Sequence, residues 1–252
     1  MRRMVAALAL VGLTAAGCSS SGGDPAQQGG KFTGSLTVDA ASSLTEAFGT
    51  LQKQFEKAHP GTHITFDFGA SDDLATQINN WQPVDVFAAA STSTMAEVKS
   101  AVRPTDFVTN KLEIATPPSN PAKITSVHNL AKPGVKVAVC DPSVPCGAVA
   151  QTVFGNAKIH VKPAANETDV KSVVATVESG EVDAGMVYVT DVRAAGSKVH
   201  GVPIPDNLNS TTTYQIAALK NAPNAAAADA FIRLVLSEAG RQVLTTAGFG
   251  RV

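Results

Sequence analysis

The sequence predicts an α/β protein whose strands form parallel sheets covered by helices on both faces. Short apolar segments alternate with segments of helical periodicity along most of the chain, which is typical of this class. The segments 84–89 and 184–189 are expected to be buried strands, as parallel sheets require. The composition is 44% hydrophobic and 16% charged, which excludes collagen, coiled coil and general disorder.

In the first half of the chain, a short apolar run predicts a strand at 36–38. Apolar residues three and four apart predict a helix over 44–58, and Pro60 ends it. Alternation over 63–68 predicts a strand with one buried face. The other elements expected here are helices at 72–81 and 91–100 and strands at 84–89 and 111–115.

In the second half, four valines on one face predict a helix over 169–178. A proline-rich turn at 141–146 separates a strand from a helix. The Ala-rich stretch 225–244 is expected to be the closing helix. The remaining expected elements are strands at 135–139, 184–189 and 214–219 and a helix at 147–154.

The order of these elements favours two α/β lobes joined by two crossings, because the pattern becomes β-rich near 200–219 before the final helix. The strands at 111–115 and 214–219 are the candidates for the crossings. We therefore expect one lobe to contain 34–113 and 214–252 and the other to contain 114–213.

The N-terminus is typical of a segment that is removed or anchored rather than folded. Residues 1–17 combine Arg2 and Arg3 with an apolar run of about a dozen residues, which suits a signal peptide and is too short to cross a bilayer. Small residues before Cys18 resemble a bacterial lipoprotein signal, which predicts lipidation of Cys18; plain secretion by cleavage is the alternative. Residues 18–33 are expected to form a flexible tether.

Two further cysteines, Cys140 and Cys146, lie six positions apart around the proline-rich turn. A disulfide between them is permitted in an oxidising compartment. Whether it forms depends on the geometry of the turn, so the spacing leaves both outcomes open.

Three strand-to-helix turns present small or hydroxyl side chains, and they span 39–46, 68–74 and 139–148. Ser43 and Glu46 have capping-box spacing, and Ser71 is placed to cap the next helix, so well-capped helices are one interpretation. Cys146 and Gly147 open the third helix. The other interpretation is an anion site made of free N–H groups and hydroxyls. Ligands of open α/β sheets bind at the carboxyl ends of strands, where all three turns lie.

These turns belong to a set of segments that occur in one order along the chain, at 40–48, 68–71, 84–88, 141–147 and 185–191. Together they resemble the periplasmic molybdate-binding proteins of ABC importers. The resemblance covers most of 34–250 and implies a two-lobed type II periplasmic-binding-protein fold. In that fold each lobe is a mostly parallel sheet flanked by helices, and the ligand lies in the cleft between the lobes.

The resemblance also implies a set of ligand-binding residues. Ser43 and Ser71 would donate hydroxyl and backbone N–H groups from one lobe. Cys146 and Val170 would donate backbone N–H groups from the other lobe, and Tyr188 would donate its hydroxyl. Molybdenum would be held as molybdate, with no side chain bound to the metal and no further cofactor.

A site of neutral donors suits a fully deprotonated tetraoxyanion, which has only acceptors. Phosphate keeps a proton near neutral pH and would favour a carboxylate acceptor. Donor type does not separate molybdate or tungstate from sulfate, so pocket size must do so. Asp39 departs from the family's first turn, and its carboxylate would repel a dianion unless it points away or is paired.

The expected function is that of a lipid-anchored binding component of an ABC importer, on the extracytoplasmic face of a bacterial cell membrane. It would bind molybdate and tungstate as a monomer, perform no catalysis, and dock on a membrane permease served by an ATPase. One alternative is a protein of the same fold for sulfate or another small oxyanion. Another is a secreted hydrolase with Ser43 or Ser71 as nucleophile, although no G-x-S-x-G motif occurs. A net charge of -1 argues against nucleic-acid binding.

Overall fold

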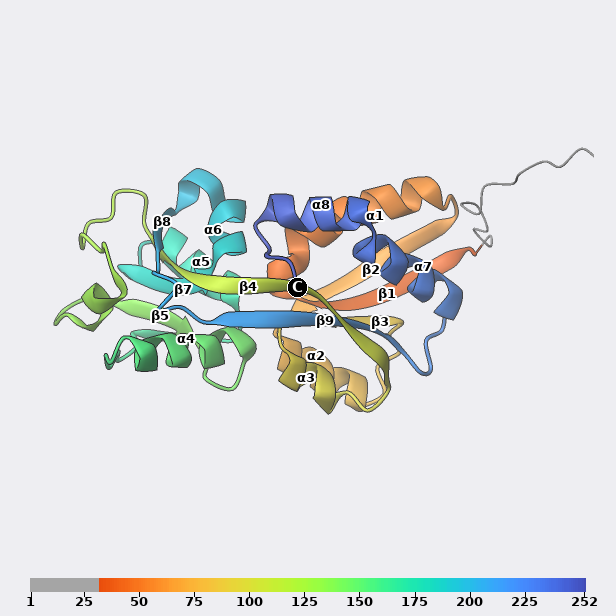
Figure 1. Ribbon diagram of the computed structural model, residues 1–252, viewed down its shortest axis with the longest axis horizontal. Helices are drawn as coiled ribbons and strands as arrows, with labels where there is room; N and C mark the ends of the chain where they lie inside the picture. The colour runs from red at the N-terminus through yellow and green to blue at the C-terminus, as the bar shows by residue number, and fades with distance from the viewer. Residues whose placement is uncertain (1–31) are drawn as a thin grey trace, which may run out of the picture. The chain divides into compact units, whose positions relative to one another are not determined.

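The computed structural model describes residues 32–252 (Figure 1). The predicted signal peptide 1–17, the predicted lipidation site Cys18 and most of the predicted tether 18–33 lie outside the described residues. Among the helices of residues 32–252, none has the length and apolar character that crossing a membrane requires.

One path of hydrogen-bonded strands runs through the fold in the order β2-β1-β3-β9-β4-β7-β5-β6, and β8 pairs with β4 outside this path. At one end, β1 is parallel to both β2 and β3; at the other, β5 is parallel to both β6 and β7. The strands are β1 (Gly34–Ala41), β2 (Thr62–Gly69), β3 (Val86–Ala89), β4 (Ala101–Thr116), β5 (Val137–Cys140), β6 (Ala165–Glu167), β7 (Ala184–Tyr188), β8 (His200–Pro203) and β9 (Thr211–Leu219).

Helices cover both faces of each half, as the predicted fold class requires. Figure 1 shows α1, α7 and α8 on one side of the β1 end and α2 and α3 on the other, with α5 and α6 facing α4 across the β5 end. Their bounds are α1 (Thr45–Ala58), α2 (Ser71–Asn79), α3 (Thr92–Glu97), α4 (Pro145–Asn156), α5 (Val170–Glu178), α6 (Val189–Ala195), α7 (Ala225–Leu236) and α8 (Glu238–Ala247). Short 3-10 turns are η1 (Ser42–Leu44), η2 (Val127–Ala131) and η3 (Gly196–Lys198).

The two halves have separate apolar cores, and we call them the first lobe (β1 to β3 with α1 to α3, α7 and α8) and the second lobe (β5 to β8 with α4 to α6). In the first, the ring of Phe231 makes edge contacts with Phe48 and Phe55 at centroid distances of 5.6 and 5.7 Å. The second core is rich in valine. These cores confirm the two-lobed α/β fold.

Strand β4 connects the two lobes. Its residues from Ala101 to Lys111 pair with β9, whereas those from Leu112 to Thr116 pair with β7 and β8. The change of partner thus falls between Lys111 and Leu112. The lobe boundaries expected from the sequence stay a prediction.

Several elements differ from the expected ones. The expected helix 91–100 ends at Glu97, and the strand that follows is much longer than 111–115, because β4 already pairs with β9 from Ala101. Strand β6 was not expected, since its three residues are not fully buried and give no apolar signal. Helix α6 was also missed, because it follows β7 directly and continues its apolar run.

The expected closing helix 225–244 is two helices. Ser237 ends α7 and caps α8, where its Oγ accepts a hydrogen bond from the N–H of Gly240 at 3.1 Å. A side chain at Gly240 would collide with the carbonyl oxygens at the end of α7. The sharp turn between α7 and α8 therefore depends on both Ser237 and Gly240.

Candidate functional site

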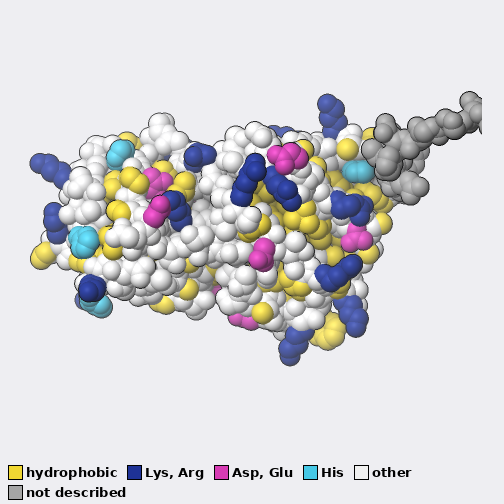
Figure 2. Space-filling model, viewed as in Figure 1, with side chains coloured by type: hydrophobic (Ala, Val, Ile, Leu, Met, Phe, Trp, Pro, Cys, Tyr) yellow, Lys and Arg dark blue, Asp and Glu magenta, His cyan; other side chains and the backbone are white. Residues whose placement is uncertain are grey.

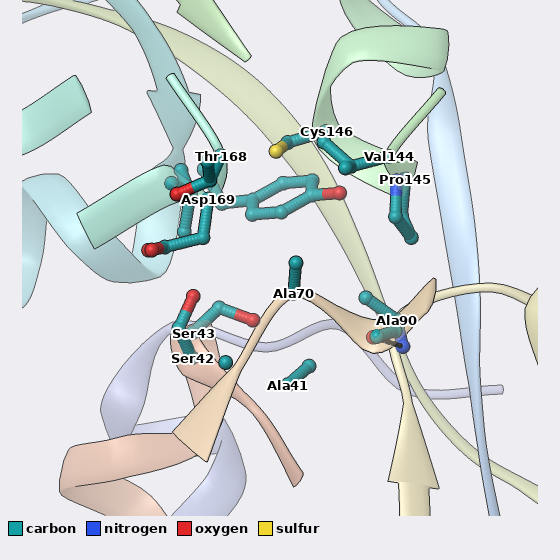
Figure 3. Close-up of a pocket in the computed structure, with 14 residues that line it drawn as sticks. Ala41, Ser42, Ser43, Ala70, Ala90, Val144, Pro145, Cys146, Thr168 and Asp169 are labelled. Carbon is teal, nitrogen blue, oxygen red and sulfur yellow. Dashed lines mark hydrogen bonds between the residues drawn. The ribbon is translucent and has the colours of Figure 1, made fainter. Parts of the chain in front are cut away.

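A small cavity lies between the lobes, where strand-to-helix turns from both of them meet. Each lobe contributes three turns, and Figure 3 shows Ser43 and Ala70 facing Cys146 and Thr168 across it. The cavity has a volume of about 20 Å³, which is enough for one or two water molecules. Such a cavity admits a small ion and excludes a sugar or a peptide.

The structure brings all five predicted site residues to this cavity. They are Ser43, Ser71, Cys146, Val170 and Tyr188. They come from the ends of β1, β2, β5, β6 and β7, so the carboxyl ends of the strands converge as the predicted topology requires.

The predicted capping roles of the two serines are wrong. Ser43 lies inside η1, and its Oγ is 2.8 Å from the hydroxyl oxygen of Tyr214. Ser71 is the first residue of α2, and its Oγ accepts a hydrogen bond from the N–H of Ala90 at 3.1 Å. Both hydroxyls are thus held from within the first lobe instead of capping a helix.

A hydrogen-bond network surrounds the hydroxyl of Ser43. The Oδ1 of Asn110 accepts from the N–H of Lys111 at 3.0 Å, so its Nδ2 is the donor toward Thr190 Oγ1 at 2.9 Å and the Tyr214 hydroxyl at 3.5 Å. In the Tyr214–Ser43 pair either hydroxyl can donate to the other. When Tyr214 donates, the hydrogen of Ser43 is available to the cavity. Ser71 accepts from the N–H of Ala90, so its own hydrogen is available to the cavity as well.

Tyr214 and Asn110 were missed by sequence reasoning, although Tyr214 has a signal in hindsight. It occupies an inward position of β9 among alternating buried residues and is fully buried. A buried tyrosine normally has a partner for its hydroxyl. Nothing local in the sequence shows that this partner is Ser43.

Backbone N–H groups converge on the cavity from three helix starts. Ser71 and Val170 are the first residues of α2 and α5, and Cys146 is the second residue of α4. The N–H groups of a first helical turn have no acceptor inside the helix. Asp169 caps α5 by accepting from the N–H groups of Lys171 and Ser172 at 2.7 and 3.3 Å, which leaves the N–H of Val170 for the cavity.

Tyr188 presents a hydroxyl without a partner. Its oxygen is buried and has no hydrogen bond within residues 32–252. Its ring lies edge-on to that of Tyr214 with centroids 6.2 Å apart. Burial raises the pKa of Tyr188 well above its ordinary value, so the group stays protonated. A buried O–H of this kind needs an acceptor, which a ligand in the cavity would supply.

The cavity is lined by donors that carry no charge. Among the described residues around it, none is lysine or arginine, and the only carboxylate is that of Asp169, which is engaged in capping α5. Figure 2 shows charged side chains scattered over the viewed face. Within residues 32–252, His, Cys, Asp and Glu form no cluster that could hold a metal ion. The arrangement can bind an anion that has acceptors only.

Comparisons with known proteins agree with this geometry. The family model of bacterial extracellular solute-binding proteins matches residues 36–250. The chain belongs to this family. As a solute-binding protein, it is 38% identical over 254 residues to the molybdate-binding protein ModA of Mycobacterium tuberculosis, with 98% of this chain and 96% of that protein covered. It is 28% identical to ModA of Haemophilus influenzae, over 85% and 89% of the two chains.

A solved solute-binding protein shows the same fold. The sulfate-binding protein SubI of Mycobacterium tuberculosis superimposes with a TM-score of 0.75, at 16% identity and with 88% of each chain covered. At this identity the likeness concerns the fold alone. It shows that the two-lobed architecture is shared by proteins named for different oxyanions.

Asp39 of this solute-binding protein carries a buried carboxyl group near an anion site. It is fully buried on β1 but does not line the cavity, and neither carboxylate oxygen has a partner within residues 32–252. Burial raises its pKa to about 7, and the negative charge of Asp67 on β2 adds to the shift. The carboxyl is therefore partly protonated at neutral pH, which weakens any repulsion of a bound anion.

Cys140 and Cys146 are joined by a disulfide. It ties the end of β5 to the first turn of α4, where Cys146 lines the cavity. Gly147 is needed at the next position, since a side chain there would collide with the carbonyl oxygen of Asp141. The disulfide and the glycine together hold this turn close to the cavity.

Proposed function

We propose that this solute-binding protein binds molybdate, and also tungstate, as the receptor of an ABC importer. The observation that carries the proposal is a small cavity between two lobes whose donors are all neutral. They are the hydroxyls of Ser43, Ser71 and Tyr188 and the backbone N–H groups of Ser71, Cys146 and Val170. Each bond to a dianion is charge-assisted on the ligand side, so neutral donors suffice.

Chemistry separates this ligand class from phosphate. Near neutral pH phosphate carries a proton that needs an acceptor, and the only carboxylate at the cavity, that of Asp169, is engaged with Lys171 and Ser172. Molybdate, tungstate and sulfate carry no proton and need only donors. Two relatives of this chain are named molybdate-binding protein ModA. Their names support assigning a larger metal oxyanion, and not sulfate, as the ligand of this protein.

The enzyme alternative lacks a general base. A serine hydrolase activates its nucleophile with an adjacent histidine or an equivalent base. Ser43 and Ser71 are hydrogen-bonded to Tyr214 and to the N–H of Ala90 instead, and no histidine is among the described residues that line the cavity. A serine-reactive fluorophosphonate should therefore leave the protein unlabelled, as read by mass spectrometry.

The proposal also includes the location of the protein, its oligomeric state and its partners. Lipidation of Cys18 would anchor it on the extracytoplasmic face of the membrane, with residues 18–33 as the tether. It would act as a monomer, and its closed form would dock on a permease that passes the ion inward with the energy of an ATPase.

The test is calorimetric titration of the chain without residues 1–18 with molybdate, tungstate, sulfate and phosphate. Molybdate and tungstate are expected to bind at micromolar concentration or below, and sulfate much more weakly. Equal binding of sulfate would overturn the assigned selectivity. Binding of none of the four would overturn the proposal as a whole.

A further inference from the structure

An ion pair joins the two lobes next to the cavity. The Nζ of Lys171, on α5 of the second lobe, lies 2.8 and 2.9 Å from the two carboxylate oxygens of Glu46, on α1 of the first lobe. The same ammonium lies 3.4 Å from Oδ1 of Asp191 on α6. Lys171 is thus held between one carboxylate from each lobe.

The two carboxylates differ in what they contribute. The side chain of Asp191 is fully buried, and its Oδ2 accepts from the N–H of Tyr188 at 3.1 Å, so its contact with Lys171 belongs to the second lobe. The side chain of Glu46 is 50% exposed. When the lobes separate, Lys171 keeps Asp191 and loses Glu46, so of these two contacts the pair with Glu46 is the one that distinguishes the closed form from an open one.

The position of the pair couples it to the cavity. Lys171 follows Val170, whose N–H faces the cavity, and Glu46 is one helical turn beyond Ser43. Neither charged side chain lines the cavity itself. A second contact crosses between the lobes nearby, where Arg193 donates to the carbonyl oxygen of Thr246 at 3.1 Å. Figure 1 shows α6 and α8, which carry these two residues, side by side.

We propose that Lys171 and Glu46 form a latch that stabilises the closed, ligand-bound form without touching the ligand. A contact made in one of two conformations shifts the equilibrium toward that conformation, even when its strength is modest. The latch therefore tightens binding chiefly by slowing ligand release, because the ligand leaves only after the lobes part. Since the pair is partly exposed, salt should weaken it.

The test rests on the proposed function and compares four proteins: the wild type, E46Q, E46K and E178Q. E46Q removes the interlobe partner and leaves the Lys171–Asp191 contact intact. E46K places a second ammonium group against Lys171. E178Q is the matched control, because Glu178 pairs with Lys198 at 3.6 Å within the second lobe and its replacement changes the net charge as E46Q does.

Affinity for molybdate is measured by calorimetry at low salt and in about 0.5 M NaCl, and release is followed by a chase with excess tungstate. At low salt E46Q should bind about two- to fivefold more weakly than the wild type, with faster release, and E46K more weakly still. E178Q should match the wild type, and high salt should narrow the gap between E46Q and the wild type. Wild-type affinity and release in both Glu46 variants would overturn the latch, whereas a wild type that binds no molybdate would overturn the proposed function instead.

Discussion

The hydroxyl oxygen of Tyr214 lies 2.8 Å from Ser43 Oγ, although Ser43 is at the start of the fold and Tyr214 is on its last strand. This bond holds the hydroxyl of a side chain at the cavity, and Tyr214 in turn accepts from Asn110. Ser43 is thereby positioned before any ligand arrives. Preorganisation of this kind reduces the entropy that binding must overcome.

Tyr214→Phe should weaken molybdate binding about threefold to tenfold, because Ser43 loses the partner that orients it. Calorimetric titration of the single variants and of the combination with Ser43→Ala measures the coupling. If Tyr214 acts through Ser43, its replacement costs little once Ser43 is alanine. Equal costs in both backgrounds would show that Tyr214 affects binding by another route.

Ser71→Ala should weaken binding by roughly 1–3 kcal/mol, the cost of removing one donor from a charged acceptor. Its backbone N–H remains, so binding is reduced and not abolished. Ser93→Ala on α3 is the control, since Ser93 is exposed and bonds only to Ser91 at 3.0 Å. The change in dissociation constant is read by calorimetry, and an unchanged constant for Ser71→Ala would remove that hydroxyl from the site.

Asp39→Asn should stabilise the protein at high pH. The folded pKa of Asp39, about 7, lies above its ordinary value of 3.8, so the folded state binds more protons between these values. The free energy of unfolding therefore falls as pH rises from about 4 to 7. The asparagine variant lacks this loss, so its stability relative to the wild type should rise by about 4 kcal/mol between pH 4 and pH 8.

Urea unfolding at several pH values measures this difference. The Asp67→Asn variant serves as a comparison, since Asp67 is exposed and only adds to the shift of Asp39. It should reproduce a small part of the effect. A constant difference between Asp39→Asn and the wild type at all pH values would show that Asp39 does not titrate in this range.

Replacing Cys140 and Cys146 together by alanine should cost about 2 kcal/mol of stability, as expected for the short loop that the disulfide closes. Molybdate affinity should change only a few-fold, because the ligand is offered the N–H of Cys146 and not its sulfur. Thermal unfolding and calorimetry give the two quantities. Loss of binding in a folded double variant would mean that the turn needs the covalent bond to keep its shape.

Sequence reasoning located the turns at the cavity because helix starts and strand ends are local features. Ser71 and Cys146 each lie where a predicted strand gives way to a predicted helix, and the structure places both at helix starts. Val170 was selected by the resemblance, because the strand before it gives no apolar signal. The resemblance to a family selected Tyr188, which periodicity alone treats as a core residue. The fold class follows from the same local alternation.

What sequence reasoning missed depends on contacts between distant residues. The capping box of Ser43 and Glu46 has the right spacing, but Tyr214 engages the serine and Lys171 engages the glutamate. The first part of β4 carries exposed residues from Val102 to Asp106, so only its pairing with β9 shows it to be a strand. These contacts join residues that are far apart in the sequence, so no local pattern predicts them.

Strands β4 and β9 are hydrogen-bonded neighbours where the chain passes between the lobes, with Lys111 opposite Thr211. Two connections bound to each other in this way act as one flexible ribbon, which permits the halves to swing about it and opposes sliding. Asn110 sits in this hinge and donates to Thr190 on one side and Tyr214 on the other. We expect bending at the hinge to change these two contacts, and Tyr214 also holds the hydroxyl of Ser43 at the cavity. The hinge and the cavity are therefore joined through a chain of side-chain contacts.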